Sequence, residues 1–382
     1  MRTKKDIFFN IRPYRDEELP LAIERMLTST GFIGSLINFV PDIPLNVLIR
    51  KIRRTKTCFD FQKDIFSKII STFKERSIDS FTVSGYENLD KNKAYLFVAN
   101  HRDIIMDSAL MQLHVLHQGV KPCLSGIGDN LLSAQIFTDV AKVCNMFTIM
   151  RSGTARDMVL NSRLVSDYIR NNITRENKSV WIAQRNGRTK DGIDKTQANV
   201  LKMLCMSARD KDIFAAVKEL NIVPLTISYE FEPCDHLKAR EMVLTEKNKK
   251  YVKMEGEDYL SMRDGIFAYK GRVHLAFGEP LDKSINENLE FQSDNEKYQY
   301  LCSLIDRQMY KNYRLWPNNH IAYDMLHNGD LFQNYYSEFS KRDFVKHISK
   351  QANVADVSYL KMKQSLLQIY ANPVQSLIDS KQ

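Results

Sequence analysis

The sequence predicts an α/β protein: a central, mostly parallel mixed sheet flanked by helices, with helical extensions at the N- and C-termini. Three observations predict this fold. Short apolar runs alternate with helical stretches between residues 81 and 277, apolar residues recur at helical spacing before residue 80, and helical periodicity returns after residue 286. A chain of 382 residues, 43% of them hydrophobic, can bury one large core or two modest ones.

Residues 1–80 are expected to form a helical region. Its most apolar window, residues 31–49, is followed by five cations between Arg50 and Lys56. Two prolines and two polar residues interrupt the window, which makes it a poor bilayer span. Two interpretations stay open: residues 31–56 lie at a membrane interface, where cations are attracted to anionic lipid, or they form a helical hairpin packed on the main domain.

Six short apolar runs are the expected strands. They cover residues 81–83, 95–99, 147–149, 180–183, 222–229 and 273–277. The stretches between them have helical periodicity, most clearly residues 152–172, and strands that alternate with helices pair in parallel. We therefore expect an α/β domain over residues 81–285.

Residues 286–382 are expected to form a C-terminal helical extension. Ser293 and Glu296 have the spacing of a capping box ahead of an apolar stripe, and residues 354–378 are also periodic. No low-complexity linker separates this region from the rest, so we expect the flanking helices to pack against the sheet.

Charge and cysteine content narrow the function classes. The net charge of +9 favours an anionic partner: nucleic acid, acidic lipid or a phosphorylated substrate. No nucleic-acid motif accompanies the basic clusters, and we expect no nucleic-acid partner. The six cysteines have neither disulfide nor zinc spacing, and the N-terminal segment is not a secretory signal. A cytoplasmic protein without a metal is therefore expected.

The strongest candidate for chemistry is His101. An apolar strand runs directly into it, which places its ring at the carboxyl end of a strand, where open α/β sheets build their sites. Asp107 can orient the imidazole and stabilise its positive charge, so that His101 acts as a general base on a hydroxyl. Asp103 is the alternative acid, and a structural histidine in a turn is the alternative role.

A protein-kinase catalytic loop also contains His-Arg-Asp, as residues 101–103 do here. A kinase would need an Asn five residues after the Asp, a glycine-rich phosphate loop and an Asp-Phe-Gly motif. The fifth residue after Asp103 is Ser108, and the other motifs are missing from the sequence. We therefore set this interpretation aside.

The pattern from Asn100 to Asp107 resembles the signature of the glycerolipid acyltransferases, in which Asn-His or Ser-His is followed by four residues and Asp. Here five residues separate His101 from Asp107. The extra residue would rotate Asp107 by about 100° in a helix, so the segment after His101 must be extended or bulged. Three further blocks follow in the family's order: residues 147–151, 184–190 and 222–227. Residues 271–281 resemble the strand and turn that close the family's domain.

The resemblance implies transfer of a fatty acyl group to a hydroxyl of a glycerophosphate or lysophospholipid acceptor. Acyl-CoA or acyl carrier protein would be the co-substrate, with no other cofactor, on an anionic membrane surface at the inner face of the cell membrane. His101 and Asp107 would be catalytic. The substrate-binding residues would be Arg151, Arg185, Asn186, Gly187 and Arg188, with Arg151 beside a helix start.

One departure from the family leaves alternatives open. The acid of the family's third block is Asn186 here, and an amide can bind a hydroxyl but carries no charge. The acceptor could instead be a lyso form of an amino-acid-containing lipid, or the chain could be a catalytically inactive relative that binds lipid or membranes.

Overall fold

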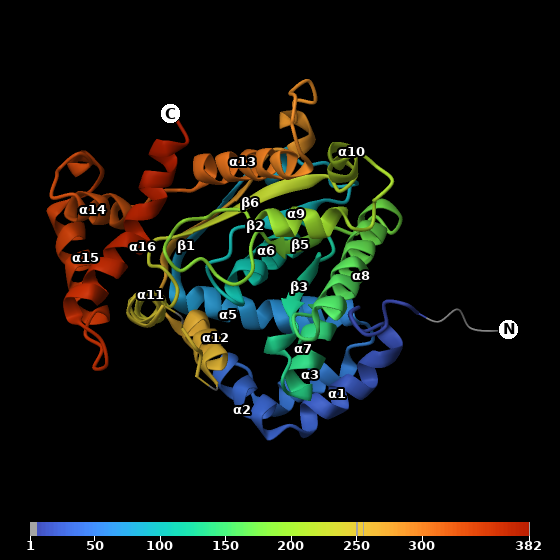
Figure 1. Cartoon of the computed structure of the whole chain (residues 1–382). Helices are drawn as coiled ribbons and strands as arrows, with labels where there is room; N and C mark the ends of the chain where they lie inside the picture. Colours follow the sequence, from blue (N-terminus) through green and yellow to red (C-terminus); the bar gives the residue numbers. More distant parts are fainter. Residues whose placement is uncertain (1–5, 250, 255, 382) are drawn as a thin grey trace.

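The computed structural model of the chain describes residues 6–249, 251–254 and 256–381 (Figure 1). The basic residues at positions 2, 4 and 5, which belong to the segment expected not to be a secretory signal, lie outside the described residues.

A seven-stranded sheet forms the centre of the molecule, with strand order β1-β7-β6-β2-β5-β3-β4. The strands are β1 (Ile78–Ser84), β2 (Leu96–Ala99), β3 (Leu124–Gly128), β4 (Met146–Ile149), β5 (Val180–Ala183), β6 (Ile222–Tyr229) and β7 (Gly271–Phe277). Only β6 and β7 pair antiparallel; the other neighbours are parallel. The expected fold class, a mostly parallel mixed sheet flanked by helices, is confirmed.

Helices surround this sheet on both faces and extend beyond it. They are α1 (Leu19–Thr28), α2 (Thr30–Phe39), α3 (Leu45–Arg54), α4 (Cys58–Phe61), α5 (Ser67–Ser77), α6 (Met106–His117), α7 (Gln135–Val143), α8 (Ala155–Thr174), α9 (Ala198–Cys205), α10 (Ile213–Lys218), α11 (Asp235–Asn248), α12 (Glu257–Phe267), α13 (Asp294–Asn312), α14 (Pro317–Leu326), α15 (Glu338–Gln351) and α16 (Tyr359–Asp379). A π-helical segment, Gln62–Phe66, joins α4 to α5.

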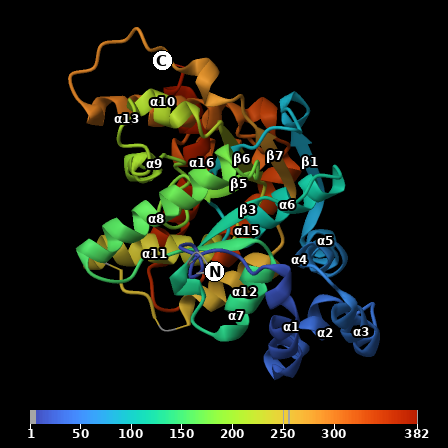
Figure 2. The ribbon, with the colours of Figure 1, turned by 90° about the vertical axis from the view of Figure 1, so that its right-hand side faces the viewer.

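Two hydrophobic layers cover the sheet because side chains alternate along each strand. In β2, Phe97 and Ala99 pack with helices α1 to α7, whereas Leu96 and Val98 pack with α8, α9, α10 and α13. Figure 2 shows these two groups of helices on opposite sides of the sheet. All four residues of β2 are buried, as expected for a central parallel strand.

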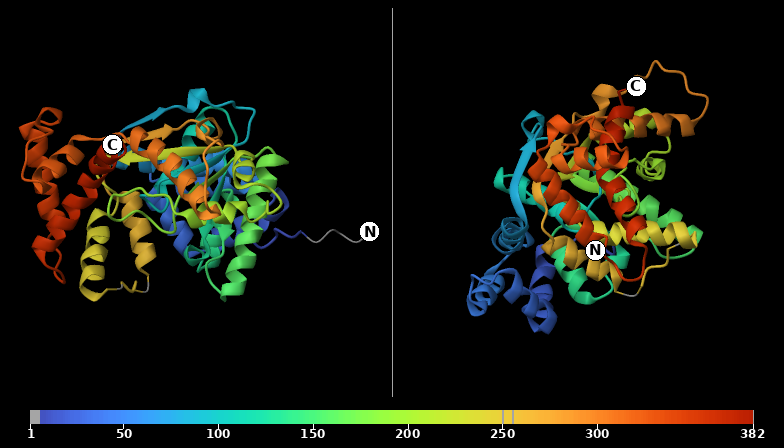
Figure 3. Two further views of the ribbon diagram at one scale, coloured as in Figure 1. Left: turned by 45° about the horizontal axis from the view of Figure 1, so that its top comes forward. Right: turned by 90° about the vertical axis from the view of Figure 1, so that its left-hand side faces the viewer.

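The C-terminal helices differ from the expectation that they all pack on the sheet. Helix α13 does so, but α14, α15 and α16 form a separate core with α11 (Figure 3). Their apolar stripes face one another, with Phe344, Ile348 and Leu366 fully buried between them. Periodicity identified the helices but not the surface each one covers.

Two other expectations need correction. Strand β3 was not expected, since Ser125, Gly126 and Gly128 break the apolar run on which a strand prediction depends. Helix α8 begins at Ala155 and not at residue 152, because Thr154 and Asp157 form a capping box that fixes its start.

The window of residues 31–49 forms α2 and the start of α3. Leu36, Val40, Leu48 and Ile52 are buried in the same core as α1 and α5, which is the arrangement of a packed hairpin. The five cations that follow, between Arg50 and Lys56, are exposed. Within the described residues, no helix is both long enough and apolar enough to cross a membrane.

Candidate active site

A cavity of about 890 Å³ opens at the carboxyl ends of the central parallel strands. His101 follows β2, Gly128 ends β3, Arg151 follows β4 and Arg185 follows β5, and all four residues line this cavity. Parallel strands place their carboxyl ends at one edge of a sheet, so residues far apart in the sequence meet there. The volume is typical of a site for a small molecule or a lipid headgroup.

His101 and Asp107 form a hydrogen-bonded pair at the cavity. Nδ1 of His101 lies 3.0 Å from Oδ2 of Asp107, and the Asp107 side chain is only 1% exposed. Residues 101–105 are not helical, which allows the carboxylate to reach the ring in spite of the extra residue. Because a carboxylate only accepts, Nδ1 carries the proton, and Nε2 is left as an acceptor.

The Asp107 carboxylate is held by other donors as well. Oδ2 accepts hydrogen bonds from the backbone N–H groups of Arg102 (2.7 Å) and Asp103 (2.8 Å), and Oδ1 accepts one from the Tyr229 hydroxyl (2.8 Å). Burial and the neighbouring carboxylates raise the pKa of Tyr229 well above its usual value, so the phenol keeps its proton. These hydrogen bonds fix the orientation of the Asp107 carboxylate toward the His101 ring.

Asp103 has a different place. Its Oδ1 accepts from the backbone N–H groups of Ile105 (2.9 Å) and Met106 (2.7 Å), so the side chain caps the start of α6. Its Oδ2 is buried against Gly265 of α12. The geometry therefore pairs His101 with Asp107 and gives Asp103 a capping role.

Arg151 reaches the cavity from the end of β4. A Cβ at residue 128 would lie 3.0 Å from Nε of Arg151, so a glycine at the end of β3 leaves room for this side chain. The expected partnership with the N–H groups of the α8 start does not form. Thr154 and Asp157 already bond to one another there, and the Asp157 carboxylate puts negative charge at the helix start.

The residues after β5 form a loop, here called the arginine loop (residues 184–197), and several of its side chains line the cavity. Gly187 has φ +74°, a left-handed conformation that favours glycine in the turn between Arg185 and Arg188. The backbone N–H of Asn186 donates to Oε1 of Gln197 (2.8 Å), which closes the loop on itself.

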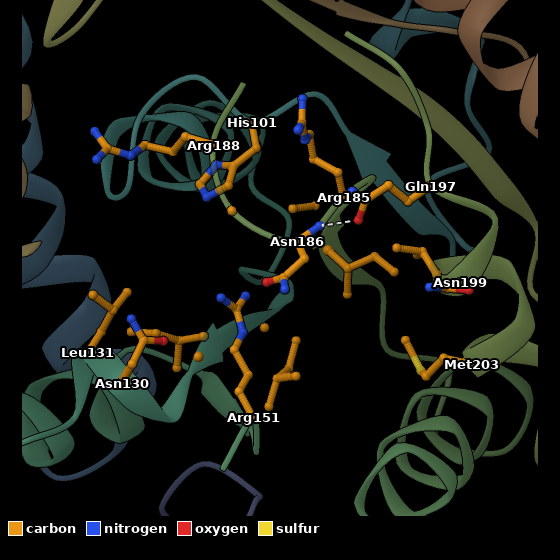
Figure 4. A pocket seen from close by; sticks show the side chains of 18 of the residues that line it. His101, Asn130, Leu131, Arg151, Arg185, Asn186, Arg188, Gln197, Asn199 and Met203 are labelled. Atoms are coloured by element: carbon orange, nitrogen blue, oxygen red, sulfur yellow. Dashed lines mark hydrogen bonds between the residues drawn. The ribbon is translucent and has the colours of Figure 1, made fainter. Parts of the chain in front are cut away.

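The basic side chains do not converge on one point. Figure 4 shows the side chains of Arg151 and Asn186 pointing toward one another across the cavity, while those of Arg185 and Arg188 run in other directions. Among the described residues, none of these three arginines has a carboxylate within ion-pair distance. Their positive charge is therefore not neutralised by an ion pair with a described residue, and the Asp258 carboxylate, which lines the same cavity, pairs with Lys253.

An apolar wall lies beside these charges. It consists of Ile104, Ile127, Met146, Ile149, Trp181, Val200 and Met203, contributed by both sheet and helices. The ring of Trp181 stands edge-on to His101, with 6.1 Å between the centroids. The cavity can thus hold a hydrocarbon chain next to the imidazole.

Two residues near the pair were missed in the sequence. Tyr229 is the last residue of an expected strand, and Asp194 lies in the arginine loop; neither has a neighbour in sequence that indicates a site. Only the pairing of β2 with β6 brings residue 229 to residue 107. A polar residue at the end of a central strand was the one available signal.

His274 and the six cysteines lie elsewhere. His274 bonds to Thr82 and Ser84 between the paired strands β7 and β1, away from the cavity. All six cysteines are buried and free. Across the part of the chain that the structure describes, no group of His, Cys, Asp or Glu side chains could hold a metal ion.

The fold is a central α/β sheet that carries a hydrogen-bonded His–Asp pair at a cavity, and comparison with known proteins indicates what this part of the chain is similar to. Residues 80–229 match the family model described as Acyltransferase. This segment contains both His101 and the arginine loop. Over this segment, which is less than half of the 382 residues, the chain is therefore similar to acyltransferases, as the motifs predicted.

One solved structure to which the chain is similar is the 1-acyl-sn-glycerophosphate (LPA) acyltransferase PlsC from Thermotoga maritima. The two share 16% sequence identity with a TM-score of 0.38, over 78% of this chain and 95% of that one. No curated protein matches the chain significantly.

Proposed function

We propose that this acyltransferase moves a fatty acyl group from a thioester to a hydroxyl of a glycerophosphate or lysophospholipid acceptor. The observation that carries the proposal is the His101–Asp107 pair in a cavity that also contains Arg151, without a carboxylate partner among the described residues, and an apolar wall. A base, an anion site and a chain-binding surface are the parts that this reaction needs.

In the proposed mechanism, Nε2 of His101 removes the proton from the acceptor hydroxyl. Asp107, fixed by its four donors, stabilises the imidazolium that forms. The alkoxide attacks the thioester carbonyl, the C–S bond breaks, and the thiolate takes the proton from the imidazolium. Neither a covalent acyl-enzyme nor a metal ion is part of this scheme.

The anionic end of the acceptor is assigned to Arg151. Its guanidinium can bind a phosphate through two parallel hydrogen bonds, and Asn186 can bind a hydroxyl of the same molecule. Arg185 and Arg188 line the cavity and add positive potential, although their side chains run away from Arg151.

The acyl chain of the donor is assigned to the apolar wall, which includes Trp181 next to His101. Acyl-CoA and acyl carrier protein both present a thioester on the same flexible arm, and both remain candidates. The basic surface suits either donor, since both are acidic.

Asn186 favours a second acceptor class. An amide in place of an acid can donate to a carboxylate as well as accept from a hydroxyl. A lyso form of an amino-acid-containing lipid is therefore the alternative acceptor. The assembled His101–Asp107 pair supports a catalyst over an inactive lipid-binding relative.

The proposed location is the cytoplasmic face of the cell membrane, as a peripheral protein. The exposed cations at the end of α3, Arg50, Lys51, Arg53 and Arg54, support contact with anionic lipid. They lie on a hairpin whose apolar side chains are largely packed inward. Membrane binding would therefore depend mainly on electrostatic attraction to lipid headgroups and less on insertion of apolar side chains into the bilayer.

Product analysis tests the proposed function. The purified protein is incubated with acyl-CoA or acyl carrier protein and, in turn, with glycerol 3-phosphate, lysophosphatidate, a lyso amino-acid lipid and a neutral monoacylglycerol. We expect acylated product with a phosphate-bearing acceptor. Product from the lyso amino-acid lipid alone would establish the alternative, and no product with any acceptor would overturn the proposal.

A further inference from the structure

Arg102, directly after His101, is the largest fully buried side chain among the described residues. Its guanidinium bonds to both carboxylate oxygens of Asp194 (2.7–3.1 Å), to Glu232 (3.1 Å) and to the carbonyl of Gly192 (3.1 Å). Burial opposes its charge, but Asp194 and Glu232 raise the pKa of Arg102 well above its usual value. Arg102 is thus firmly anchored directly after His101.

Asp194 is the residue on which several of these bonds converge. Besides Arg102, its carboxylate accepts from Nδ2 of Asn100 (2.8 Å) and from the hydroxyl of Thr189 (2.9 Å). Asn100 and Arg102 flank His101 on either side, and Thr189 follows Arg188 in the arginine loop. The buried Asp194 carboxylate therefore contacts the residues on both sides of His101. It also contacts the loop that carries Arg185 and Arg188.

A second bond joins the same two segments. The backbone N–H of Thr189 donates to the carbonyl of His101 (2.7 Å). The far side of the cluster is closed by Lys238 of α11, which donates to the carbonyl of Arg102 (2.6 Å) and to Glu232. Two cations, Arg102 and Lys238, thus pair with two carboxylates, Asp194 and Glu232, which offsets part of the cost of burying their charges.

We propose that Asp194 is a positioning residue: through Arg102, Asn100 and Thr189 it holds the His101 backbone and the arginine loop in one fixed arrangement. Displacing it moves the base relative to Asp107 and the loop relative to the cavity at the same time. Neither Asp194 nor Arg102 lines the cavity, so their effect reaches the site only through the groups they hold.

The structure offers a matched control for the loss of a buried carboxylate. Asp139 is also fully buried and bonds to Arg25 (2.6 and 2.8 Å), to Tyr14 and to Gln135, but it lies on α7 and does not line the cavity. Asp194→Asn and Asp139→Asn both remove the charge of a buried carboxylate that pairs with an arginine. Only the first is expected to disturb the site.

The test uses two readouts that do not require turnover. In protein with isotope-labelled histidine, the Nδ1–H proton of His101, identified by its loss in His101→Ala, reports on the bond to Asp107. Calorimetry with glycerol 3-phosphate reports on the arginine loop through Asn186, which is assigned to a hydroxyl of the acceptor, and through the positive potential of Arg185 and Arg188. Asp194→Asn is expected to lose or shift the proton signal and to weaken binding at least about tenfold, while Asp139→Asn changes neither.

A folded Asp194→Asn protein with the wild-type proton signal and wild-type binding would overturn the proposal. If this variant does not fold, Thr189→Val, which removes only the hydroxyl bond to Asp194, takes its place. It is expected to weaken glycerol 3-phosphate binding and keep the proton signal, and unchanged binding would overturn the proposal.

The binding measurement, unlike the proton signal, rests on the proposed function. Wild-type protein that does not bind glycerol 3-phosphate would count against that function, and the proton signal of Asp194→Asn would then decide whether Asp194 positions His101.

Discussion

The hydroxyl of Tyr229 donates a hydrogen bond of 2.8 Å to Oδ1 of Asp107, the oxygen opposite the one that faces His101. The two residues are 122 positions apart and meet because β6 pairs with β2. Tyr229 is 1% exposed. Asp107, which bonds to His101, is therefore itself oriented from the core.

Tyr229→Phe is predicted to lower kcat about tenfold and to destabilise the fold by about 1–3 kcal/mol, because it leaves a buried carboxylate oxygen without a donor. Steady-state kinetics and chemical denaturation measure the two effects. Tyr336→Phe is the control, since Tyr336 donates to buried Asp324 (2.9 Å) in the C-terminal helical core, outside the cavity. Its stability should fall and its kcat should not. Equal losses of kcat in the two variants would contradict a specific role for Tyr229.

Arg151→Gln is predicted to raise KM for a phosphate-bearing acceptor about 10- to 100-fold, equivalent to a charge-assisted contact of about 1.5–3 kcal/mol. The KM for the acyl donor should change little. Arg156→Gln, at an exposed arginine on the first turn of α8, is the control and should leave both constants unchanged. A larger effect on donor than on acceptor KM would reverse the assignment of the two ends of the cavity.

Asp306 gives a prediction for stability against pH. Burial raises its pKa to about 6, although hydrogen bonds from Thr196 at the end of the arginine loop lower it. A carboxyl whose pKa is higher in the folded state binds more protons when folded, so its ionisation reduces stability as pH rises from about 4 to about 6.

Asp306→Asn should remove this loss. Its free energy of unfolding should exceed that of wild type by about 2–3 kcal/mol above pH 7 and equal it near pH 4. Urea denaturation at several pH values measures the difference. A difference that does not vary with pH would mean that Asp306 is not the group that titrates.

The exposed cations of α3 give a prediction about membranes. Replacing Arg50, Lys51, Arg53 and Arg54 by Gln should weaken co-sedimentation with anionic vesicles at least tenfold, since each cation near anionic lipid contributes about 1 kcal/mol. The control replaces four lysines that line a small cavity elsewhere: Lys91, Lys93, Lys121 and Lys178. Equal losses in the two variants would show general charge attraction and no specific membrane surface on α3.

Sequence periodicity predicted six of the seven strands, the fold class and the segment that carries His101, because these depend on local apolar patterns. It missed β3, whose glycines make room for Arg151 and Ile149 rather than filling a core. The sequence also predicted an anion site at the start of α8. There the side chains of Thr154 and Asp157 already accept hydrogen bonds from backbone N–H groups at the helix start.

The residues that hold the His101–Asp107 pair in place could not be predicted from local sequence. Tyr229 and Asp194 contact the His101 segment over 122 and 92 positions, through strand order and loop packing that no short motif encodes. The spacing of His101 and Asp107 indicated that the intervening segment is not helical. It did not indicate that Arg102, within that segment, would be buried in an ion cluster.

The most direct measurement of the central claim is acceptor-dependent release of free thiol from an acyl thioester by wild type, His101→Ala and His274→Ala. His274 is the control because it lies on β7, away from the cavity. We predict that His101→Ala lowers the acceptor-dependent rate about 10²- to 10⁴-fold and that His274→Ala keeps it. An unchanged rate in folded His101→Ala would contradict the assignment of His101 as the base.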